Sequence, residues 1–168
     1  IKIRRFAFFV DGVSVPYIHA GGKIGVLVNL EVSGGIDVSE IGKDVAMQIA
    51  ALNPRFLDKG QVTQDVLDEE KKIMMAQMAN DPKMAAKPEQ VREKIVMGKL
   101  NKFYAENCLL QQEFVKDNSV SVEQYVAAAA KNLGGSIKLK DAVRFEKGEG
   151  IEKKQENFAE EIAKQLGK

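Results

Sequence analysis

The chain has 168 residues, of which 45% are hydrophobic and 29% are charged, a composition that allows one globular core and excludes a chain disordered by composition. Its 25 basic and 24 acidic residues give a formal net charge of +1, which argues against an extended nucleic-acid surface or a groove for acidic substrates. A single cysteine, Cys108, excludes an intramolecular disulfide framework and is typical of a reducing compartment, and no apolar run reaches membrane-spanning length.

Residues 1–10, IKIRRFAFFV, have the composition and part of the alternation of a β-strand. The chain starts inside this pattern and without a methionine, so we expect that an upstream part of the protein is missing. Residues 11–20 are expected to form a turn and a loop that leads to Gly21 and Gly22. One of these glycines should have a positive φ, because the chain must turn sharply there. A phosphate site is the alternative, but phosphate-binding glycines open a helix and these open a strand.

The stretch GGKIGVLVNLEV, residues 21–32, is predicted to be the central strand of a sheet. Its apolar residues first run continuously and then alternate with polar ones, as in a strand that is buried on both faces at one end. A buried helix is the alternative, but the run is short, rich in Val and flanked by glycines. Residues 136–147, SIKLKDAVRFEK, are the third predicted strand and return only after a long helical stretch. We therefore expect an α+β fold, a three-stranded antiparallel sheet covered by helices.

A first helix is predicted to begin at Asp37, with Glu40 at the spacing of a capping box. Apolar residues follow at helical intervals until the Asn53-Pro54 pair ends the helix. Its single apolar stripe should lie on the sheet.

Two longer helical patterns, residues 63–79 and 88–105, are separated by an Asn-Asp-Pro sequence and predict an antiparallel helical hairpin. Their apolar stripes are thin for a core face, so the hairpin should project as an arm. Methionines occur here at positions 74, 75, 78, 84 and 97. They either fill irregular gaps in the packing or form an adaptable binding surface, and we favour the first interpretation.

Residues 108–115 are expected to be a short apolar linker, in which Cys108 is a buried structural thiol because no histidine or basic cluster is close in sequence. Ser121 and Gln124 form a second capping box, and the helix that they start should end at the glycine pair 134–135. Residues 149–168 are predicted to form a C-terminal helical module with an apolar stripe. This stripe docks either on the protein's own core or on a partner, and periodicity alone favours the first.

The sequence contains no pattern of a catalytic or metal site. His19 is the only histidine and is far from Cys108, so a zinc site is not expected. The nucleophile-elbow motif is absent, and acidic pairs such as Glu69-Glu70 lie among lysines, which is typical of a solvated helix face. We expect a binding or structural domain without catalytic residues, cofactor or metal.

Several stretches resemble elongation factor Ts: IGVLVNLE (24–31), DVAMQIAALNPRFL (44–57), EKIVMGKLNKFYAENCLLQQEFVKD (93–117) and RFEKGEGIEKKQENFAEEIA (144–163). They follow the order of the family and span nearly the whole chain. The resemblance implies a guanine-nucleotide exchange factor of translation elongation, which binds the GTPase elongation factor Tu and promotes GDP release. It implies no enzyme activity, and a location in the bacterial cytoplasm or, in a eukaryote, in an organelle matrix or stroma.

The resemblance also implies a division of the chain. Residues 1–62 and 106–148 would be the two parts of a core subdomain, 63–105 a coiled-coil dimerisation arm, and 149–168 a C-terminal module that docks on the GTPase. A homodimer or a two-plus-two complex, through the arm or the sheet, is expected, without membrane or direct nucleic-acid contact. The alternatives are a structural dimerisation domain that does not bind the GTPase by itself and, with weaker support, an RNA-binding translation accessory.

The loop YIHAGG, residues 17–22, matches a family loop that lies against the third domain of the GTPase. The resemblance therefore implies that partner-binding residues lie in this loop and in the last helix: Tyr17, Ile18, His19, Gly21, Gly22, Phe158 and Ile162. Without the resemblance, His19 would be interpreted as a residue that caps a turn.

Two departures from the family are visible. The Thr-Asp-Phe-Val motif, which in the family inserts near the magnesium site of the GTPase, does not occur in the sequence, and the amino-terminal helical domain is also missing. The chain is therefore expected to be a carboxy-terminal portion of such a factor, with impaired exchange. Gln48 takes the place of a histidine common in relatives, which removes a titratable group from the first helix.

Overall fold

The computed structural model describes residues 3–151 of the chain. The strands are β1 (Val13–His19), β2 (Ile24–Ser33), β3 (Glu113–Phe114), β4 (Asp117–Ser121) and β5 (Ser136–Glu146). The helices are α1 (Ser39–Leu52), α2 (Gln64–Ala79), α3 (Pro82–Ala85), α4 (Glu89–Asn107) and α5 (Val122–Leu133), with short 3₁₀ turns at Ala20–Gly22, Lys59–Gln61 and Leu109–Gln111. The predicted C-terminal helix, with Phe158 and Ile162, lies outside the described residues.

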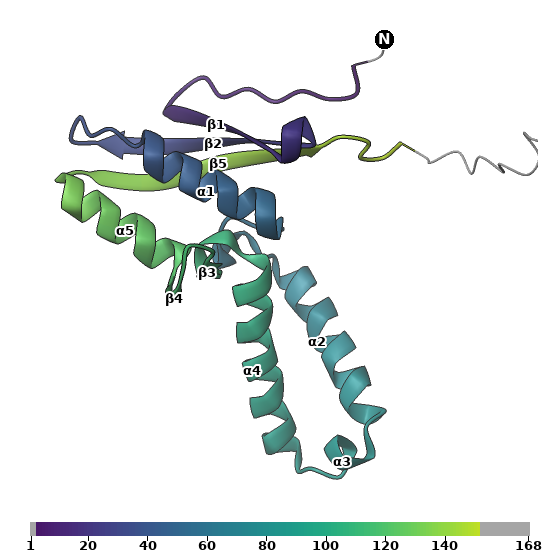
Figure 1. Cartoon of the computed structure of the whole chain (residues 1–168). Helices are drawn as coiled ribbons and strands as arrows, with labels where there is room; N and C mark the ends of the chain where they lie inside the picture. The colour runs from purple at the N-terminus through teal and green to yellow at the C-terminus, as the bar shows by residue number, and fades with distance from the viewer. Residues whose placement is uncertain (1–2, 152–168) are drawn as a thin grey trace, which may run out of the picture.

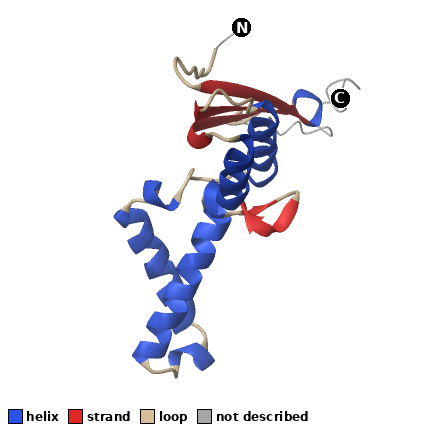
Figure 2. Cartoon of the chain, turned by 90° about the vertical axis from the view of Figure 1, so that its left-hand side faces the viewer, coloured by secondary structure: helices blue, strands red, loops and turns tan. Residues whose placement is uncertain are grey.

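The main sheet has the strand order β1-β2-β5 and is antiparallel throughout, so the predicted central strand and the α+β class are confirmed. One face of β2 carries Val26, Val28 and Leu30, which are buried beneath α1 and α5. The helices lie on that face, and the N-terminal segment runs along the opposite face (Figures 1 and 2). Helix α1 lies close to β1, because a Cβ added at Gly42 would be only 2.5 Å from Val15.

The prediction that residues 1–10 form the first strand is wrong for the residues that the structure describes. Residues 3–9 have no regular structure, and β1 is the segment 13–19, which had been assigned to a loop. Pro16 is compatible with β1, because β1 is an edge strand and needs hydrogen bonds on one side only. In the segment that precedes it, Phe6 and Phe8 are 77% and 70% exposed and stack on each other.

The helix termini follow the sequence in two cases and depart from it in one. At α5, Ser121 and Gln124 form the predicted capping box, and Gly134 ends the helix in the left-handed conformation. The predicted box at α1 is not formed, because Asp37 accepts hydrogen bonds from the backbone and hydroxyl of Ser39 instead of the amide of Glu40. These bonds hold the pKa of the Asp37 carboxyl below its ordinary value.

Helices α2 and α4 form the predicted hairpin, which projects from the sheet and its helices (Figure 1). Its interior is a separate cluster of buried residues: Val62, Met74, Met78, Val96, Leu100, Phe103 and Cys108. Met74 and Met78 fill this interior as predicted, whereas Met97 is 61% exposed. The hairpin joins the core at a neck, where the amide of Leu109 donates to the carbonyl of Phe56 at 2.9 Å.

The segment after α4 is more regular than the predicted linker. It contains a 3₁₀ turn and the two short strands β3 and β4, which pair with each other. Cys108 is completely buried at the neck, and this burial raises the pKa of its thiol. The structural role predicted for the thiol agrees with this environment.

Candidate functional site

The connection between β1 and β2 is the most distinctive backbone feature near the predicted partner-binding residues. Ala20, Gly21 and Gly22 have φ values of 50°, 63° and 87°, so three consecutive residues are left-handed. The predicted positive φ is thus confirmed, and both glycines have it. No atom lies within 4 Å of a Cβ added at either glycine, so the backbone conformation, and not a lack of space, favours glycine here.

Tyr17 and His19 lie on the same face of β1, because alternate residues of a strand point to the same side. The Tyr17 hydroxyl and the Nδ1 atom of His19 are 3.1 Å apart, and the two ring centroids are 5.8 Å apart. The Tyr17 ring also packs against the main core, so it fixes this pair to the sheet. Ile18 points to the other face and is 68% exposed.

The structure therefore brings together the part of the predicted site that it describes. Tyr17 and His19 lie on the helix-covered side of the edge strand, Ile18 lies on the other side, and Gly21 and Gly22 form the tip. A partner that contacts all of them must enclose the end of the β1–β2 hairpin. Phe158 and Ile162, the remaining predicted residues, lie outside the described range, so their relation to this tip is not tested.

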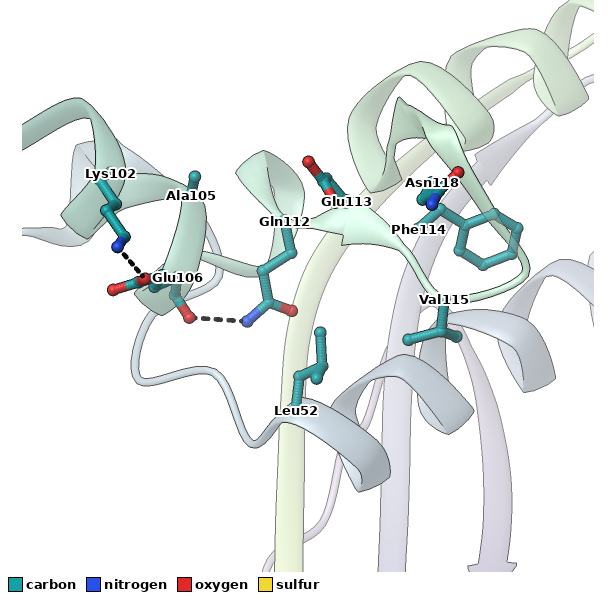
Figure 3. Close-up of a pocket in the computed structure, with 9 residues that line it drawn as sticks. All are labelled: Leu52, Lys102, Ala105, Glu106, Gln112, Glu113, Phe114, Val115 and Asn118. Carbon is teal, nitrogen blue, oxygen red and sulfur yellow. Dashed lines mark hydrogen bonds and ion pairs between the residues drawn. The ribbon is translucent and has the colours of Figure 1, made fainter. Parts of the chain in front are cut away.

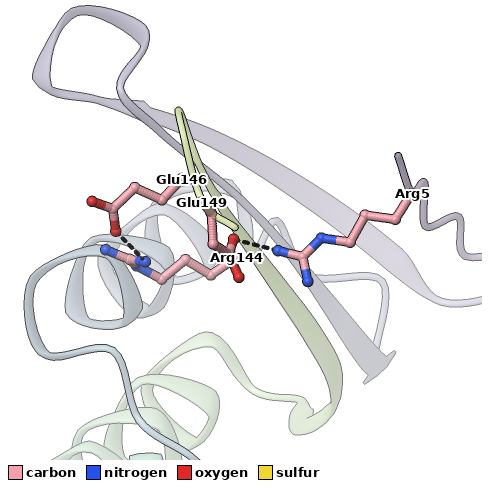
Figure 4. Close-up of polar contacts among 4 residues, drawn as sticks. All are labelled: Arg5, Arg144, Glu146 and Glu149. Carbon is pink, nitrogen blue, oxygen red and sulfur yellow. Dashed lines mark hydrogen bonds and ion pairs between the residues drawn. The ribbon is translucent and has the colours of Figure 1, made fainter. Parts of the chain in front are cut away.

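The neighbouring end of the sheet is rich in charges that are paired. In the sheet, His19 is opposite Ile24, which is opposite Glu146. Glu146 accepts a hydrogen bond from Arg144 at 2.9 Å, and Arg5 of the N-terminal segment pairs with Glu149 (Figure 4). The Arg5 guanidinium also lies 4.6 Å from the centroid of the Phe145 ring. These contacts stabilise the end of β5, which lies next to the end of the β1–β2 hairpin in the sheet.

A buried amide network, which no pattern in the sequence predicts, joins α1 to the base of the arm. The Nε2 atom of Gln48 donates to Oε1 of Gln112 at 3.1 Å, and the Oε1 atom of Gln48 accepts from the amide of Val115 at 2.8 Å. Gln112 in turn donates to the carbonyl of Glu106 at the end of α4. Gln48 and Gln112 are 0% and 2% exposed, so the hydrogen bond between the two side chains is protected from water.

A second polar group lies beside this network. Asp44, which is buried, accepts hydrogen bonds from Lys116 and from the Tyr125 hydroxyl, the latter at 2.7 Å. The bond to Asp44 raises the pKa of Lys116, and burial together with the same carboxylate raises the pKa of Tyr125. Each of these polar groups has a hydrogen-bond partner within the cluster, which is typical of a structural cluster and not of a catalytic pair.

A groove with a volume of about 570 Å³ lies in the corner between the core and the arm (Figure 3). Within it, Lys102 and Glu106 form an ion pair at 3.6 Å, and the Gln112 amide is engaged in the network described above. The groove contains no histidine or cysteine. It is lined by Leu52, Lys102, Ala105, Glu106, Gln112, Glu113, Phe114, Val115 and Asn118.

Residues 3–151 contain no group of three or more His, Cys, Asp or Glu side chains that could hold a metal ion. None of the helices in this range is both long and apolar enough to cross a bilayer. The β1–β2 tip is the candidate binding site in this range, because it holds the predicted partner-binding residues that the structure describes.

Comparison with known proteins identifies a family. A family model described as "Elongation factor TS" matches residues 1–149. An elongation factor Ts of Clostridium kluyveri is 48% identical over 169 residues, which cover 99% of this chain and 54% of the relative. An elongation factor Ts of Clostridium botulinum is 50% identical over 173 residues, which cover 100% of this chain and 55% of the relative. The chain thus spans about half the length of the curated relatives that it matches.

Proposed function

The chain belongs to the elongation factor Ts family, and on this premise we propose that it is the GTPase-binding portion of a guanine-nucleotide exchange factor of translation elongation. Its partner would be elongation factor Tu, from which the complete factor promotes release of GDP. The proposal places the protein in the bacterial cytoplasm, or in an organelle matrix if the source is a eukaryote.

The observation that carries the proposal is the β1–β2 tip. It projects at the end of the sheet, it exposes an apolar residue beside a histidine, and its backbone is fixed in a left-handed turn. Because the central strand β2 and the Tyr17 ring anchor it to the core, the tip would pay little conformational entropy on binding. The contact set that we propose in this tip is Tyr17, Ile18, His19, Gly21 and Gly22, with Phe158 and Ile162 as a second contact from the C-terminal module.

Nucleotide exchange neither forms nor breaks a covalent bond, so we do not propose an enzyme activity. It accelerates GDP release by binding the nucleotide-free GTPase more tightly than the GDP-bound form. Contacts that are equally strong in both forms add affinity but do not change the rate of release. The Thr-Asp-Phe-Val motif does not occur in the sequence, so we propose that this chain alone binds the GTPase weakly and promotes nucleotide exchange poorly.

The experiment is the release of a fluorescent GDP analogue from elongation factor Tu at saturating concentrations of the chain. We expect binding, seen in a parallel titration, with a release rate well below that produced by an intact factor. A release rate equal to that of the intact factor contradicts the proposed impairment, and absence of binding contradicts the proposed function.

A second role in self-association is supported by a separate observation. The arm exposes Ile73, Met75, Val91 and Met97, which are between 40% and 61% exposed. We propose that these residues contribute to a homodimer or a two-plus-two complex with the GTPase. Analytical ultracentrifugation of the native chain and of the Met97→Gln variant tests this role, since the variant should dissociate at a higher concentration.

A further inference from the structure

We propose that Tyr17 is a positioning residue for His19. Its hydroxyl donates a hydrogen bond to the Nδ1 atom of the imidazole, which places the imidazole proton on Nε2 and makes His19 a hydrogen-bond donor toward the partner. The role in binding rests on the proposed function, whereas the tautomer itself is a property of the free chain.

The geometry of β1 brings the two rings together. Tyr17 and His19 are separated by one residue on the same face of the strand, and both are half-buried. The oxygen and Nδ1 lie 3.1 Å apart, within hydrogen-bond distance, and the rings are tilted by 32°. Among the described residues, this is the only side-chain hydrogen bond of either Tyr17 or His19. No other hydrogen-bond partner in the described range therefore competes for the hydroxyl or the imidazole.

Acidity decides the direction of this hydrogen bond. A neutral imidazole has one donor and one acceptor nitrogen, and its tautomer follows from the bond that the other nitrogen makes. A phenol is a stronger acid than a neutral imidazole N–H, and an imidazole nitrogen is a better acceptor than a phenol oxygen. The Tyr17 hydroxyl therefore donates, Nδ1 accepts, and Nε2 carries the proton.

The partner chemistry follows from this tautomer. A donor at Nε2 requires an acceptor, which in a protein partner is a backbone carbonyl or a carboxylate oxygen. Because the Tyr17 ring packs against the core, the hydroxyl also restricts the rotation of the imidazole before the partner arrives. Ile18 and the glycines of the tip would form the surface around this donor, and the Nε2–H group of His19 would fix the position of the partner's acceptor.

His19 is the only histidine in the chain, so ¹⁵N-labelled histidine reports on this imidazole without any assignment step. With the imidazole in its neutral form, the native chain should show a pyridine-like signal for Nδ1 and a pyrrole-like signal for Nε2. Tyr17→Phe keeps the packed ring and removes the hydroxyl, so both signals should move toward their tautomeric averages. Tyr104→Phe, which removes a hydroxyl from the arm, should leave them unchanged.

Two results of this measurement would overturn the proposal. One is a pyrrole-like Nδ1 in the native chain, which would mean that His19 donates to Tyr17. The other is an identical spectrum for the native chain and Tyr17→Phe. Neither depends on the GTPase, so the tautomer is tested even if the proposed function fails.

Binding to the GTPase then tests the use of the donor. Tyr17→Phe should weaken affinity by about threefold to tenfold, the usual effect of one hydrogen bond. His19→Gln, whose amide can place a donor near the Nε2 position, should retain more affinity than His19→Asn, whose amide reaches only the Nδ1 position. In the His19→Gln background, Tyr17→Phe should have no further effect. Equal losses for the two amide variants, or an unchanged loss for Tyr17→Phe in that background, would contradict the positioning role.

Discussion

The sheet with its covering helices and the helical arm are packed in different ways. The core is filled by β-branched and aliphatic residues from distant parts of the sequence, such as Val28, Leu30 and Val126. It also contains buried polar side chains that are hydrogen-bonded to each other, Gln48 with Gln112 and Asp44 with Tyr125. The arm depends on a narrow seam between two helices, to which methionines contribute much of the volume. The core can therefore hold the β1–β2 turn rigidly, whereas the arm is stabilised mainly by its own local contacts.

The largest expected difference is in the response to truncation of buried side chains. Leu30→Ala, at a fully buried position of β2, should cost about 3–5 kcal/mol, because the surrounding sheet cannot close the cavity. Met78→Ala in the arm should cost about 2 kcal/mol, because two helices can shift toward each other. Hydrogen exchange should show lower protection everywhere in the first variant and only in the arm in the second. If Met78→Ala lowers protection in β2 as much as in α2, the two regions are not independent.

The buried amide network should give the next largest effect. Gln48→Ala leaves the amide of Val115 and the carbonyl of Glu113 without partners, and we expect a loss of about 2–3 kcal/mol in urea denaturation. Gln77→Ala, an exposed position of the arm, should change stability by less than about 0.5 kcal/mol. A Gln48→Ala loss as small as that of the control would mean that water replaces the network without cost.

Substitutions at two glycines with open space around them should change the stability in opposite directions. No atom lies within 4 Å of a Cβ added at Gly22 or at Gly98, but Gly22 has a φ of 87° and Gly98 lies within α4. Gly22→Val should therefore destabilise the core by about 1–2 kcal/mol, and Gly98→Ala should stabilise the arm by about 1 kcal/mol. Thermal denaturation of both variants checks this. Changes of the same sign would show that backbone conformation does not control the two sites.

Part of the fold was accessible from the sequence because the signals were local. The central strand, the hairpin and the capping box of Ser121 and Gln124 each depend on residues close in sequence, and the structure contains all three. The first strand was misplaced because residues 1–10 and 13–19 both have strand-like composition, and only pairing with β2 distinguishes them. That pairing places Tyr17 and His19 on one face, so the contact would have been visible once the strand was located correctly.

The polar network could not be predicted from the sequence. Gln48 and Gln112 are 64 residues apart, and glutamine is usually exposed, so neither residue signals a buried partner. The same holds for Asp44, whose partner Lys116 directly follows the predicted linker and whose partner Tyr125 lies in a predicted helix. The tertiary packing brings these residues together, and the periodicity of apolar residues in the sequence does not predict such contacts.

The smallest expected effect concerns acid. Because hydrogen bonds from Ser39 keep the pKa of Asp37 below its ordinary value of 3.8, the carboxylate stabilises the folded state above that value, and the contribution is lost as the pH falls through the lowered pKa. Asp37→Asn should therefore make the stability of the core less dependent on pH in this acidic range. The free energy of unfolding of both chains is measured by denaturation at a series of acidic pH values. If the difference between the native chain and Asp37→Asn stays the same at every pH, this assignment is contradicted.

We expect the core, through the β1–β2 tip, to carry the affinity for the GTPase, and the arm to contribute no direct contact. Calorimetric titration of elongation factor Tu with His19→Ala and with Gln77→Ala, an exposed residue of the arm outside its apolar patch, measures both contributions. We expect a loss of about 2 kcal/mol or more, roughly 30-fold in Kd, for His19→Ala and no change for Gln77→Ala. Unchanged binding of His19→Ala, or a comparable loss for Gln77→Ala, would contradict this expectation.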